Sequence, residues 1–131
     1  MRPDAGAAPA HILFLDDDPF LSELGPLQLR RLGYRVTGFQ DSGAALAAFH
    51  AAPQTFDLVL TDLVMPGLPG TALAAAIRAR RPDVPIVLYS GSAPASAALP
   101  AGLEVDAVLQ KPLRLQELAT VLHQVLEGRR C

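Results

Sequence analysis

Acidic residues are concentrated near the start of this chain, where Asp16, Asp17 and Asp18 follow directly on the apolar run Ile12–Leu15. Two unit charges about 4 Å apart repel each other by about 4 kcal/mol at an effective dielectric constant of ~20. Solvent, a lysine, or a hard divalent cation held by oxygen ligands could offset that repulsion. The triplet is therefore a candidate cation site.

Three further polar residues each stand at the end of a short apolar run: Asp62, Ser90 and Lys111. A carboxylate can act as a nucleophile toward phosphorus and form an aspartyl phosphate. Clustered acidic oxygens bind Mg²⁺, which shares its coordination shell with phosphate oxygens and water. A metal ion, a lysine and a hydroxyl together would neutralise a transferring phosphoryl group. These residue types are suited to phosphoryl transfer onto a carboxylate.

The elements that must position these residues alternate between apolar strand-like runs and helix-like segments. Five strands alternating with helices predict an α/β fold, a doubly wound parallel sheet with helices on both faces. Right-handed crossovers then place the carboxyl ends of all strands at one edge, where ligands bind in such folds. The predicted strands are Ile12–Leu15, Tyr34–Phe39, Leu58–Thr61, Ile86–Ser90 and Ala107–Gln110. The predicted helices are Pro19–Leu32, Ser42–His50, Thr71–Arg80, Ala95–Leu99 and Leu113–Leu126.

Length and composition narrow the class of protein. The 131 residues suit one domain, which we place at 11–127, with a flexible arm or linker at 1–10 and a tail at 128–131. No apolar stretch approaches the roughly 18 residues of a membrane span. The formal net charge of −2 gives no reason to expect binding to nucleic acid or a membrane surface. Cys131 is the only cysteine, which fits a reducing, cytoplasmic location.

Four motifs in order resemble the response-regulator receiver family of two-component signalling, over residues 10–126. They are Asp16-Asp17, the segment 62–67 (Asp-Leu-Val-Met-Pro-Gly), Ser90 and Lys111-Pro112. The resemblance implies the flavodoxin-like strand order 2-1-3-4-5. It also implies a phosphoryl acceptor rather than an enzyme, with a phosphohistidine on a sensor histidine kinase or histidine phosphotransfer protein as donor. The chain also resembles the C-terminal receiver of a hybrid sensor histidine kinase.

The resemblance assigns a role to each acidic residue. It makes Asp62 the phospho-acceptor. It makes Asp17, Asp62 and the backbone carbonyl of Val64 the ligands of Mg²⁺ or Mn²⁺, with Asp16 acting through a metal-bound water.

The same resemblance assigns the phosphoryl-binding and switch positions. Lys111, Ser90 and Gly91 would bind the phosphoryl group, and the peptide bond before Pro112 would be cis. The face formed by the segments 95–99, 107–110 and 113–126 would change its partners on phosphorylation, or form a dimer.

Several positions differ from the family pattern, and two of them bear on function. Val108 stands where an aromatic switch residue is usual, so the aromatic coupling mechanism is in question. Val64, two residues after the acceptor, is apolar and cannot orient an attacking water through its side chain. We therefore expect slow self-dephosphorylation.

Two alternatives stay open at this stage. The first is a receiver-like binding module that is not regulated by phosphate. The second is a haloacid-dehalogenase-type phosphatase with Asp16 as its nucleophile, because Asp16-x-Asp18 follows an apolar strand. Pro19-Phe20 does not supply the Thr or Val that such an enzyme carries soon after the second Asp.

Overall fold

The sheet has five parallel strands in the order β2-β1-β3-β4-β5, as predicted. A computed structural model describes residues 9–63, 68–91, 105–111 and 114–130 of the chain. The three inner strands, β1, β3 and β4, form because each is a short, largely apolar run, and they are buried almost throughout. Their bounds are β1 His11–Leu15, β2 Arg35–Phe39, β3 Leu58–Asp62, β4 Ile86–Ser90 and β5 Ala107–Gln110.

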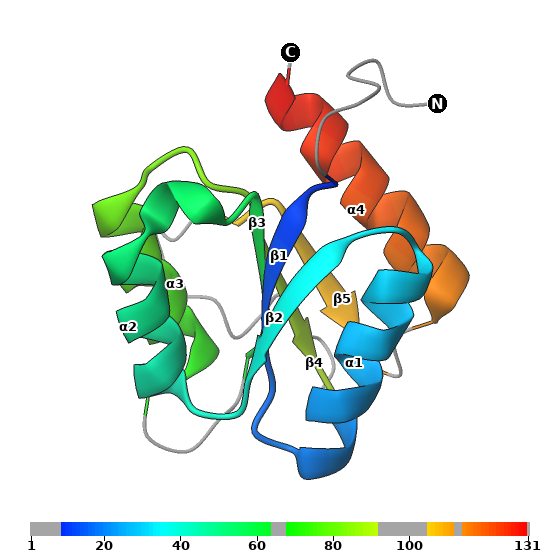
Figure 1. Cartoon of the computed structure of the whole chain (residues 1–131), viewed down its shortest axis with the longest axis horizontal. Coiled ribbons are helices and arrows are strands. Elements are labelled where there is room, and N and C mark those ends of the chain that lie inside the picture. The colour runs from blue at the N-terminus through cyan, green and yellow to red at the C-terminus, as the bar shows by residue number, and fades with distance from the viewer. Residues whose placement is uncertain (1–8, 64–67, 92–104, 112–113, 131) are drawn as a thin grey trace.

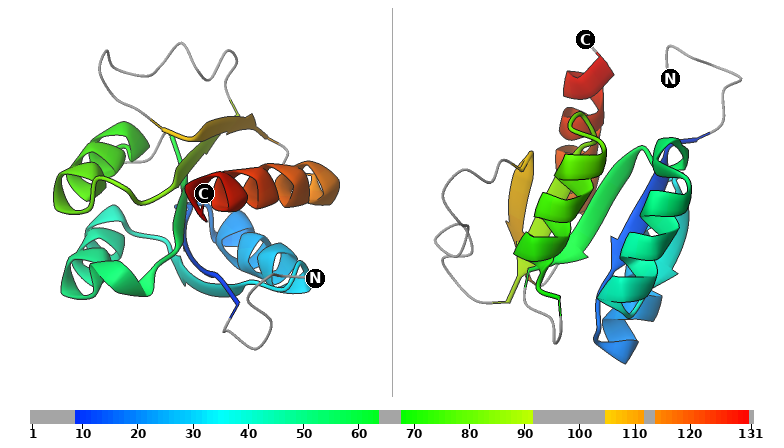
Figure 2. Two further views of the ribbon diagram at one scale, coloured as in Figure 1. Left: turned by 90° about the horizontal axis from the view of Figure 1, so that it is seen from above. Right: turned by 90° about the vertical axis from the view of Figure 1, so that its left-hand side faces the viewer.

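Helices cover both faces of the sheet, which confirms the doubly wound prediction (Figures 1 and 2). On one face lie α1 (Pro19–Arg31) and α4 (Leu115–Arg130), and on the other lie α2 (Ser42–Ala51) and α3 (Gly70–Arg80). A short 3₁₀ helix, η1 (Pro53–Thr55), precedes β3. The predicted helix Ala95–Leu99 lies outside the described residues.

The predicted bounds agree within one residue for every strand and for the first three helices. The last helix differs more, since it begins at Leu115 and continues to Arg130 instead of running from Leu113 to Leu126. Within the described ranges only Gly33 has the positive φ that commonly ends a helix, so Gly128 does not interrupt α4.

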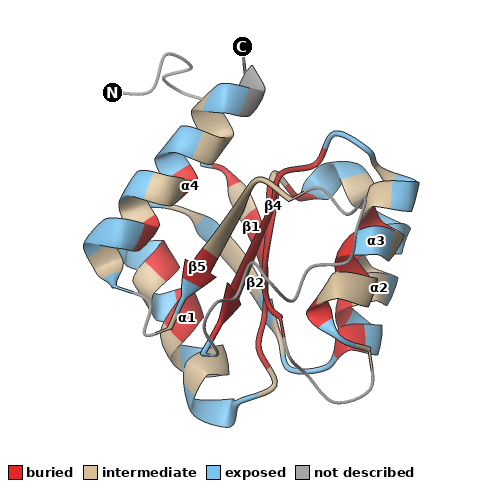
Figure 3. Ribbon diagram, turned by 180° about the vertical axis from the view of Figure 1, so that it is seen from behind, coloured by how far each residue is buried: buried red, intermediate tan, exposed pale blue. Residues whose placement is uncertain are grey.

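Two apolar cores flank the sheet, and the central strands between them are buried (Figure 3). Alternate side chains of each strand enter opposite cores because successive residues of a strand point to opposite faces. The core under α2 and α3 includes Leu13, Leu15, Phe49, Leu73 and Ile77. The core under α1 and α4 includes Phe14, Leu29, Tyr89, Leu118 and Leu122.

Side-chain caps fix the beginnings of α1 and α2, and the cap of α1 divides the acidic triplet. Asp18 Oδ1 accepts hydrogen bonds from the backbone N–H groups of Phe20 and Leu21, at 2.8 and 3.1 Å. Such an N-cap bond satisfies helix donors that have no partner inside the helix. Asp18 is therefore a capping residue of α1, which leaves Asp16 and Asp17 for the edge of the sheet.

Gly25 allows α1 to lie close against β1. A Cβ atom at this position would be only 2.2 Å from the Cζ atom of the buried Phe14. The Phe14 ring in turn stacks on Tyr89, with centroids 5.9 Å apart. The absence of a side chain at Gly25 thus sets the packing beneath the acidic end of β1.

Candidate functional site

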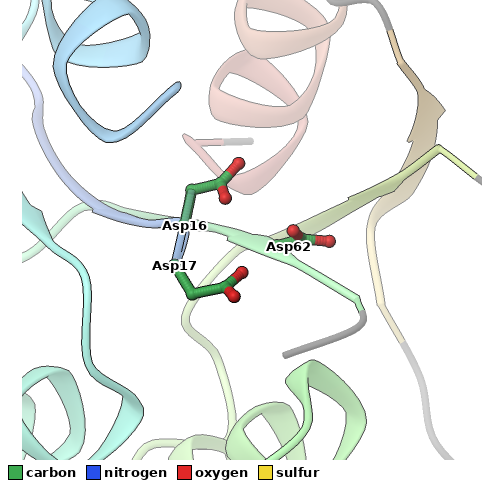
Figure 4. A group of neighbouring side chains, drawn as sticks. All are labelled: Asp16, Asp17 and Asp62. Atoms are coloured by element: carbon green, nitrogen blue, oxygen red, sulfur yellow. The ribbon is translucent and has the colours of Figure 1, made fainter. Parts of the chain in front are cut away.

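Three carboxylates meet at the carboxyl edge of the sheet. Asp16 and Asp17 follow β1, and Asp62 ends the neighbouring strand β3, where Leu15 pairs with Thr61. One carboxylate oxygen from each of the three residues lies within 4.8 Å of the others. Figure 4 shows Asp16 and Asp17 leaving the end of β1 in opposite directions, with both carboxylates turned to the side of Asp62. Asp16 is fully buried, Asp62 is 5% exposed and Asp17 is half-buried.

Lys111 brings a positive charge to this cluster from the end of β5. Its Nζ atom lies 3.0 Å from Asp62 Oδ2 and 3.4 Å from Asp16 Oδ2. The Lys111 backbone N–H donates to the carbonyl of Ser90 at 2.8 Å. This hydrogen bond fixes the position of the Lys111 backbone, from which the side chain extends. The sequence therefore predicted correctly that these residues of three strands would come together.

The protonation of Lys111 follows from these neighbours. Burial lowers the pKa of Lys111, but the hydrogen bond from its ammonium to Asp62 and the charges of Asp62 and Asp16 outweigh that effect and raise the pKa above the usual 10.5. Because the pKa is raised in the folded state, the ammonium contributes stability that is fully present below pH 10.5. That contribution is lost only as the pH rises through the higher folded-state value.

Tyr89 is a site residue that the sequence analysis missed. Its hydroxyl donates to Asp16 Oδ2 at 2.6 Å, and its ring lies 5.0 Å from Lys111 Nζ. Burial, followed by the hydrogen bond and charge of Asp16, raises the pKa of Tyr89, so the hydroxyl stays protonated at neutral pH. The available signal was a tyrosine in the otherwise apolar run before Ser90, since a buried tyrosine hydroxyl usually finds a hydrogen-bond partner.

The predicted phosphoryl-binding residues lie beside Asp62. Ser90 is buried at the end of β4, one residue after Tyr89, which pairs with Asp62. Gly91 follows, and a Cβ atom there would be 3.8 Å from Lys111 Cδ. Two further predictions, the metal-binding carbonyl of Val64 and the cis peptide at Pro112, fall outside the described residues.

Val108 does not lie among these residues. It packs against the core under α2 and α3. An aromatic ring does lie against Lys111, but it is that of Tyr89 on the neighbouring strand.

The cluster has the composition of a site for a hard divalent cation. Its donors are carboxylate oxygens, which Mg²⁺ prefers. Lys111 supplies one positive charge against three carboxylates, two of which are buried. The donor set therefore fits Mg²⁺.

The fold and this site define an α/β domain built to receive a phosphoryl group at the carboxyl edge of its sheet. The chain belongs to the response regulator receiver family, whose sequence model, described as "Response regulator receiver domain", matches residues 12–123. It is therefore a receiver domain, a phosphoryl acceptor of two-component signalling rather than a catalytic enzyme. This assignment removes the phosphatase alternative, and the acidic cluster is typical of Mg²⁺ binding in receivers.

Proteins with similar sequences include one of nearly the length of this chain and others that are much longer. The response regulator receiver protein CpdR of Brucella abortus is 32% identical over 116 residues, which are 88% of this chain and 95% of CpdR. The probable transcriptional regulatory protein TcrX of Mycobacterium tuberculosis is 29% identical over 93% of this chain. Sensor kinase CckA of Brucella abortus is 31% identical over 90% of this chain and 13% of its own length. The chain spans about half of TcrX (52%).

Solved receiver structures have the same fold. The receiver domain of sensor histidine kinase PA1611 from Pseudomonas aeruginosa PAO1, which has magnesium coordinated in its active-site cleft, matches with a TM-score of 0.82 and 28% identity. That match covers 92% of this chain and 99% of the other. Chemotaxis protein CheY4 of Vibrio cholerae matches with a TM-score of 0.80 and 26% identity, over 90% of this chain and 99% of CheY4. In this chain, no helix among the described residues is long and apolar enough to cross a membrane.

Gly70, the first residue of α3, was also missed by the sequence analysis, and it gives a testable prediction. A Cβ atom there would be 2.1 Å from the backbone oxygen of Asp62 and 2.9 Å from Leu63 Cα. We expect Gly70→Ala to displace the backbone of Asp62, to destabilise the fold by about 1–3 kcal/mol, as overpacking does, and to slow phosphoryl uptake. Urea denaturation and the rate of uptake from acetyl phosphate measure the two effects.

The matched control is Gly128→Ala, because a Cβ atom at Gly128 in α4 would have no neighbour within 4 Å. This variant should retain the wild-type uptake rate and gain slightly in stability from helix propensity. Equal uptake rates for Gly70→Ala and Gly128→Ala would contradict a positioning role for Gly70.

Proposed function

We propose that Asp62 accepts a phosphoryl group from a phosphohistidine on a sensor histidine kinase or histidine phosphotransfer protein. The observation that carries this proposal is the convergence of Lys111, Asp16 and Asp17 on the Asp62 carboxylate. Asp62 stands at the end of β3, where a donor can approach from the carboxyl edge of the sheet.

In the proposed transfer, an Asp62 carboxylate oxygen forms a bond to phosphorus while the N–P bond to the donor histidine breaks. The electron pair of that bond leaves with the imidazole nitrogen. Lys111 neutralises the negative charge of the phosphoryl oxygens, and the hydroxyl of Ser90 donates a hydrogen bond to them. Gly91 would also bind the phosphoryl group, and a Cβ atom there would be only in ordinary contact with the Lys111 side chain, 3.8 Å from Cδ.

Asp17, Asp62 and the backbone carbonyl of Val64 would hold the cation, Mg²⁺ or Mn²⁺, and Asp16 would contact it through water. When bound, the cation neutralises both the carboxylates and the phosphoryl oxygens. Because Asp16 and Asp62 are buried, solvent screens the repulsion between their carboxylates poorly. That unscreened repulsion favours a bound cation.

Incubation with acetyl phosphate and Mg²⁺, followed by intact-mass measurement, tests the proposal. The expected result is a gain of one phosphoryl group that disappears when the cation is chelated beforehand. A folded protein that gains no phosphoryl group from acetyl phosphate or from a panel of kinases would contradict the proposal and favour the phosphate-independent binding module.

The aspartyl phosphate should be long-lived, because Val64 offers no polar side chain to orient an attacking water. The test follows loss of radiolabel from phosphorylated protein after acetyl phosphate and kinase are removed. We expect a lifetime of the label at the long end for receivers, and we expect Val64→Asn to shorten it. Loss of the label within seconds in the wild-type chain, without a phosphatase, would contradict this prediction.

We infer that the output surface includes β5 and α4. A pocket of about 440 Å³ lies between these elements and is lined by Asp106, Ala107, Val121, Gln124, Val125 and Gly128. The segment 95–99, the third part of the predicted face, lies outside the described residues. We propose a cytoplasmic domain at 11–127 that changes its partner, or pairs with a second copy, through this face.

A further inference from the structure

Asp16 is the fully buried member of the acidic cluster, and three groups of the protein surround its carboxylate. Oδ1 accepts a hydrogen bond from the backbone N–H of Asp18 at 2.9 Å. Oδ2 accepts one from the Tyr89 hydroxyl at 2.6 Å, while Lys111 Nζ lies farther away at 3.4 Å. The ammonium is closer to Asp62, at 3.0 Å. The distance from Oδ2 to the Tyr89 hydroxyl is thus shorter than its distance to the Lys111 ammonium.

We propose that Tyr89 is a positioning residue of the phosphoryl-acceptor site, whose hydroxyl orients Asp16 and leaves the Lys111 ammonium for Asp62. This inference rests on the proposed function, because it assumes that Asp16 and Asp62 form the cation and acceptor site. In this role Tyr89 does not contact the phosphoryl group.

The position of Tyr89 allows it to act on both sides of the site. Its ring is held by stacking on Phe14, with an interplanar angle of 16°. Lys111 Nζ lies over the same ring, 5.0 Å from the centroid, within the range of a cation–π interaction. Its backbone carbonyl accepts the N–H of Leu63 at 2.8 Å, directly after Asp62. One residue of β4 therefore contacts the supporting carboxylate, the lysine and the segment that carries the acceptor.

The Tyr89 hydroxyl is a neutral hydrogen-bond donor to Asp16, and its presence affects where the Lys111 ammonium lies. A buried carboxylate without enough donors raises the free energy of the folded state, and nearby charges rearrange to compensate. If the hydroxyl were removed, Lys111 would be the nearest side-chain donor to Oδ2 among the described residues, and its ammonium would move toward Asp16 and away from Asp62. Supporting hydrogen bonds to metal-binding groups typically change metal affinity by 10–100-fold.

A purely structural role makes a different prediction. As a core residue, Tyr89 would contribute its ring to the packing under α1 and α4, and its hydroxyl would serve the hydrogen bond that it also donates to the carbonyl of Leu15, at 3.3 Å. Tyr89→Phe would then lower stability by about 1 kcal/mol, the typical worth of one hydrogen bond. It would leave cation affinity and the surroundings of Lys111 unchanged.

The test compares Tyr89→Phe with Tyr34→Phe in the full chain. Both variants lose one hydroxyl from a tyrosine ring, and Tyr34 stands before β2, at the opposite edge of the sheet. Mg²⁺ affinity is measured by titration calorimetry. Lys111 is the only lysine of the chain, so selective ¹³C-lysine labelling gives an NMR signal from the site alone.

We expect Tyr89→Phe to weaken Mg²⁺ binding about tenfold and to shift the Lys111 signal, while Tyr34→Phe changes neither. A folded Tyr89→Phe variant with wild-type Mg²⁺ affinity and an unchanged Lys111 signal would overturn the inference. Absence of Mg²⁺ binding by the wild-type chain would instead contradict the proposed function.

A second measurement does not require the variant to fold. The chain has two tyrosines, Tyr34 and Tyr89, so ¹³C-tyrosine labelling resolves both rings in the wild type. We expect the Tyr89 ring signals to shift during Mg²⁺ titration, with the midpoint that calorimetry gives, while those of Tyr34 stay fixed. No shift of Tyr89 at saturating Mg²⁺ would overturn the inference.

Discussion

Replacing Asp62 with Asn is expected to abolish phosphoryl uptake from acetyl phosphate while the domain stays folded. The amide has nearly the shape of the carboxylate but is a poor nucleophile toward phosphorus. Because Asp62 is buried near Asp16 and Asp17, losing its charge also removes repulsion within the cluster. We therefore expect the free energy of unfolding without Mg²⁺ to be maintained or increased. Intact-mass measurement and urea denaturation check the two results.

Asp83→Asn is the control for Asp62→Asn. Asp83 is an exposed carboxylate before β4, at the edge of the sheet opposite the cluster, and it pairs with Arg81 at 3.2 Å. Its amide variant should take up one phosphoryl group at the wild-type rate. Uptake by Asp62→Asn at a comparable rate would contradict the assignment and move the acceptor to another residue.

Replacing Lys111 with Met is expected to reduce the rate of phosphoryl uptake by about two orders of magnitude. The change keeps a long, unbranched side chain but removes the charge that meets Asp62 and Asp16 at 3.0 and 3.4 Å. Loss of one donor to a developing oxyanion typically reduces rates about 10²–10³-fold. Rapid quenching followed by mass measurement gives the rate.

The same variant should lose stability at neutral pH, because two buried carboxylates are left without their cationic partner. Added Mg²⁺ should restore part of that loss, since a bound cation replaces the missing charge. Arg80→Met, which removes an exposed charge at the end of α3, should change neither rate nor stability appreciably. A Lys111→Met uptake rate close to that of Arg80→Met would contradict the role of Lys111.

The sequence was sufficient to predict the sheet and the composition of its carboxyl edge. Strands such as Ile86–Ser90 are continuous apolar runs closed by polar residues, which is the pattern of a strand buried on both faces. Once parallel order is inferred, the ends of β1, β3 and β5 must lie at one edge, so Asp16, Asp62 and Lys111 come together.

The sequence was not sufficient to identify Tyr89 or Gly70. The contact between Tyr89 and Asp16 depends on the direction in which Asp16 leaves β1, which residue spacing alone does not fix. The need for glycine at position 70 depends on how closely α3 approaches the backbone of Asp62. The extension of α4 past Gly128 was missed because a glycine often ends a helix but keeps helical geometry when packing and neighbouring residues allow it.

The most direct test of the central claim is to locate the phosphoryl group on the wild-type chain. Phosphorylated protein is reduced with borohydride, which converts an aspartyl phosphate into homoserine, and the modified residue is identified by tandem mass spectrometry. The proposed chemistry predicts homoserine at position 62 and unmodified residues at positions 16 and 17. Homoserine at position 16 or 17, with Asp62 intact, would contradict it.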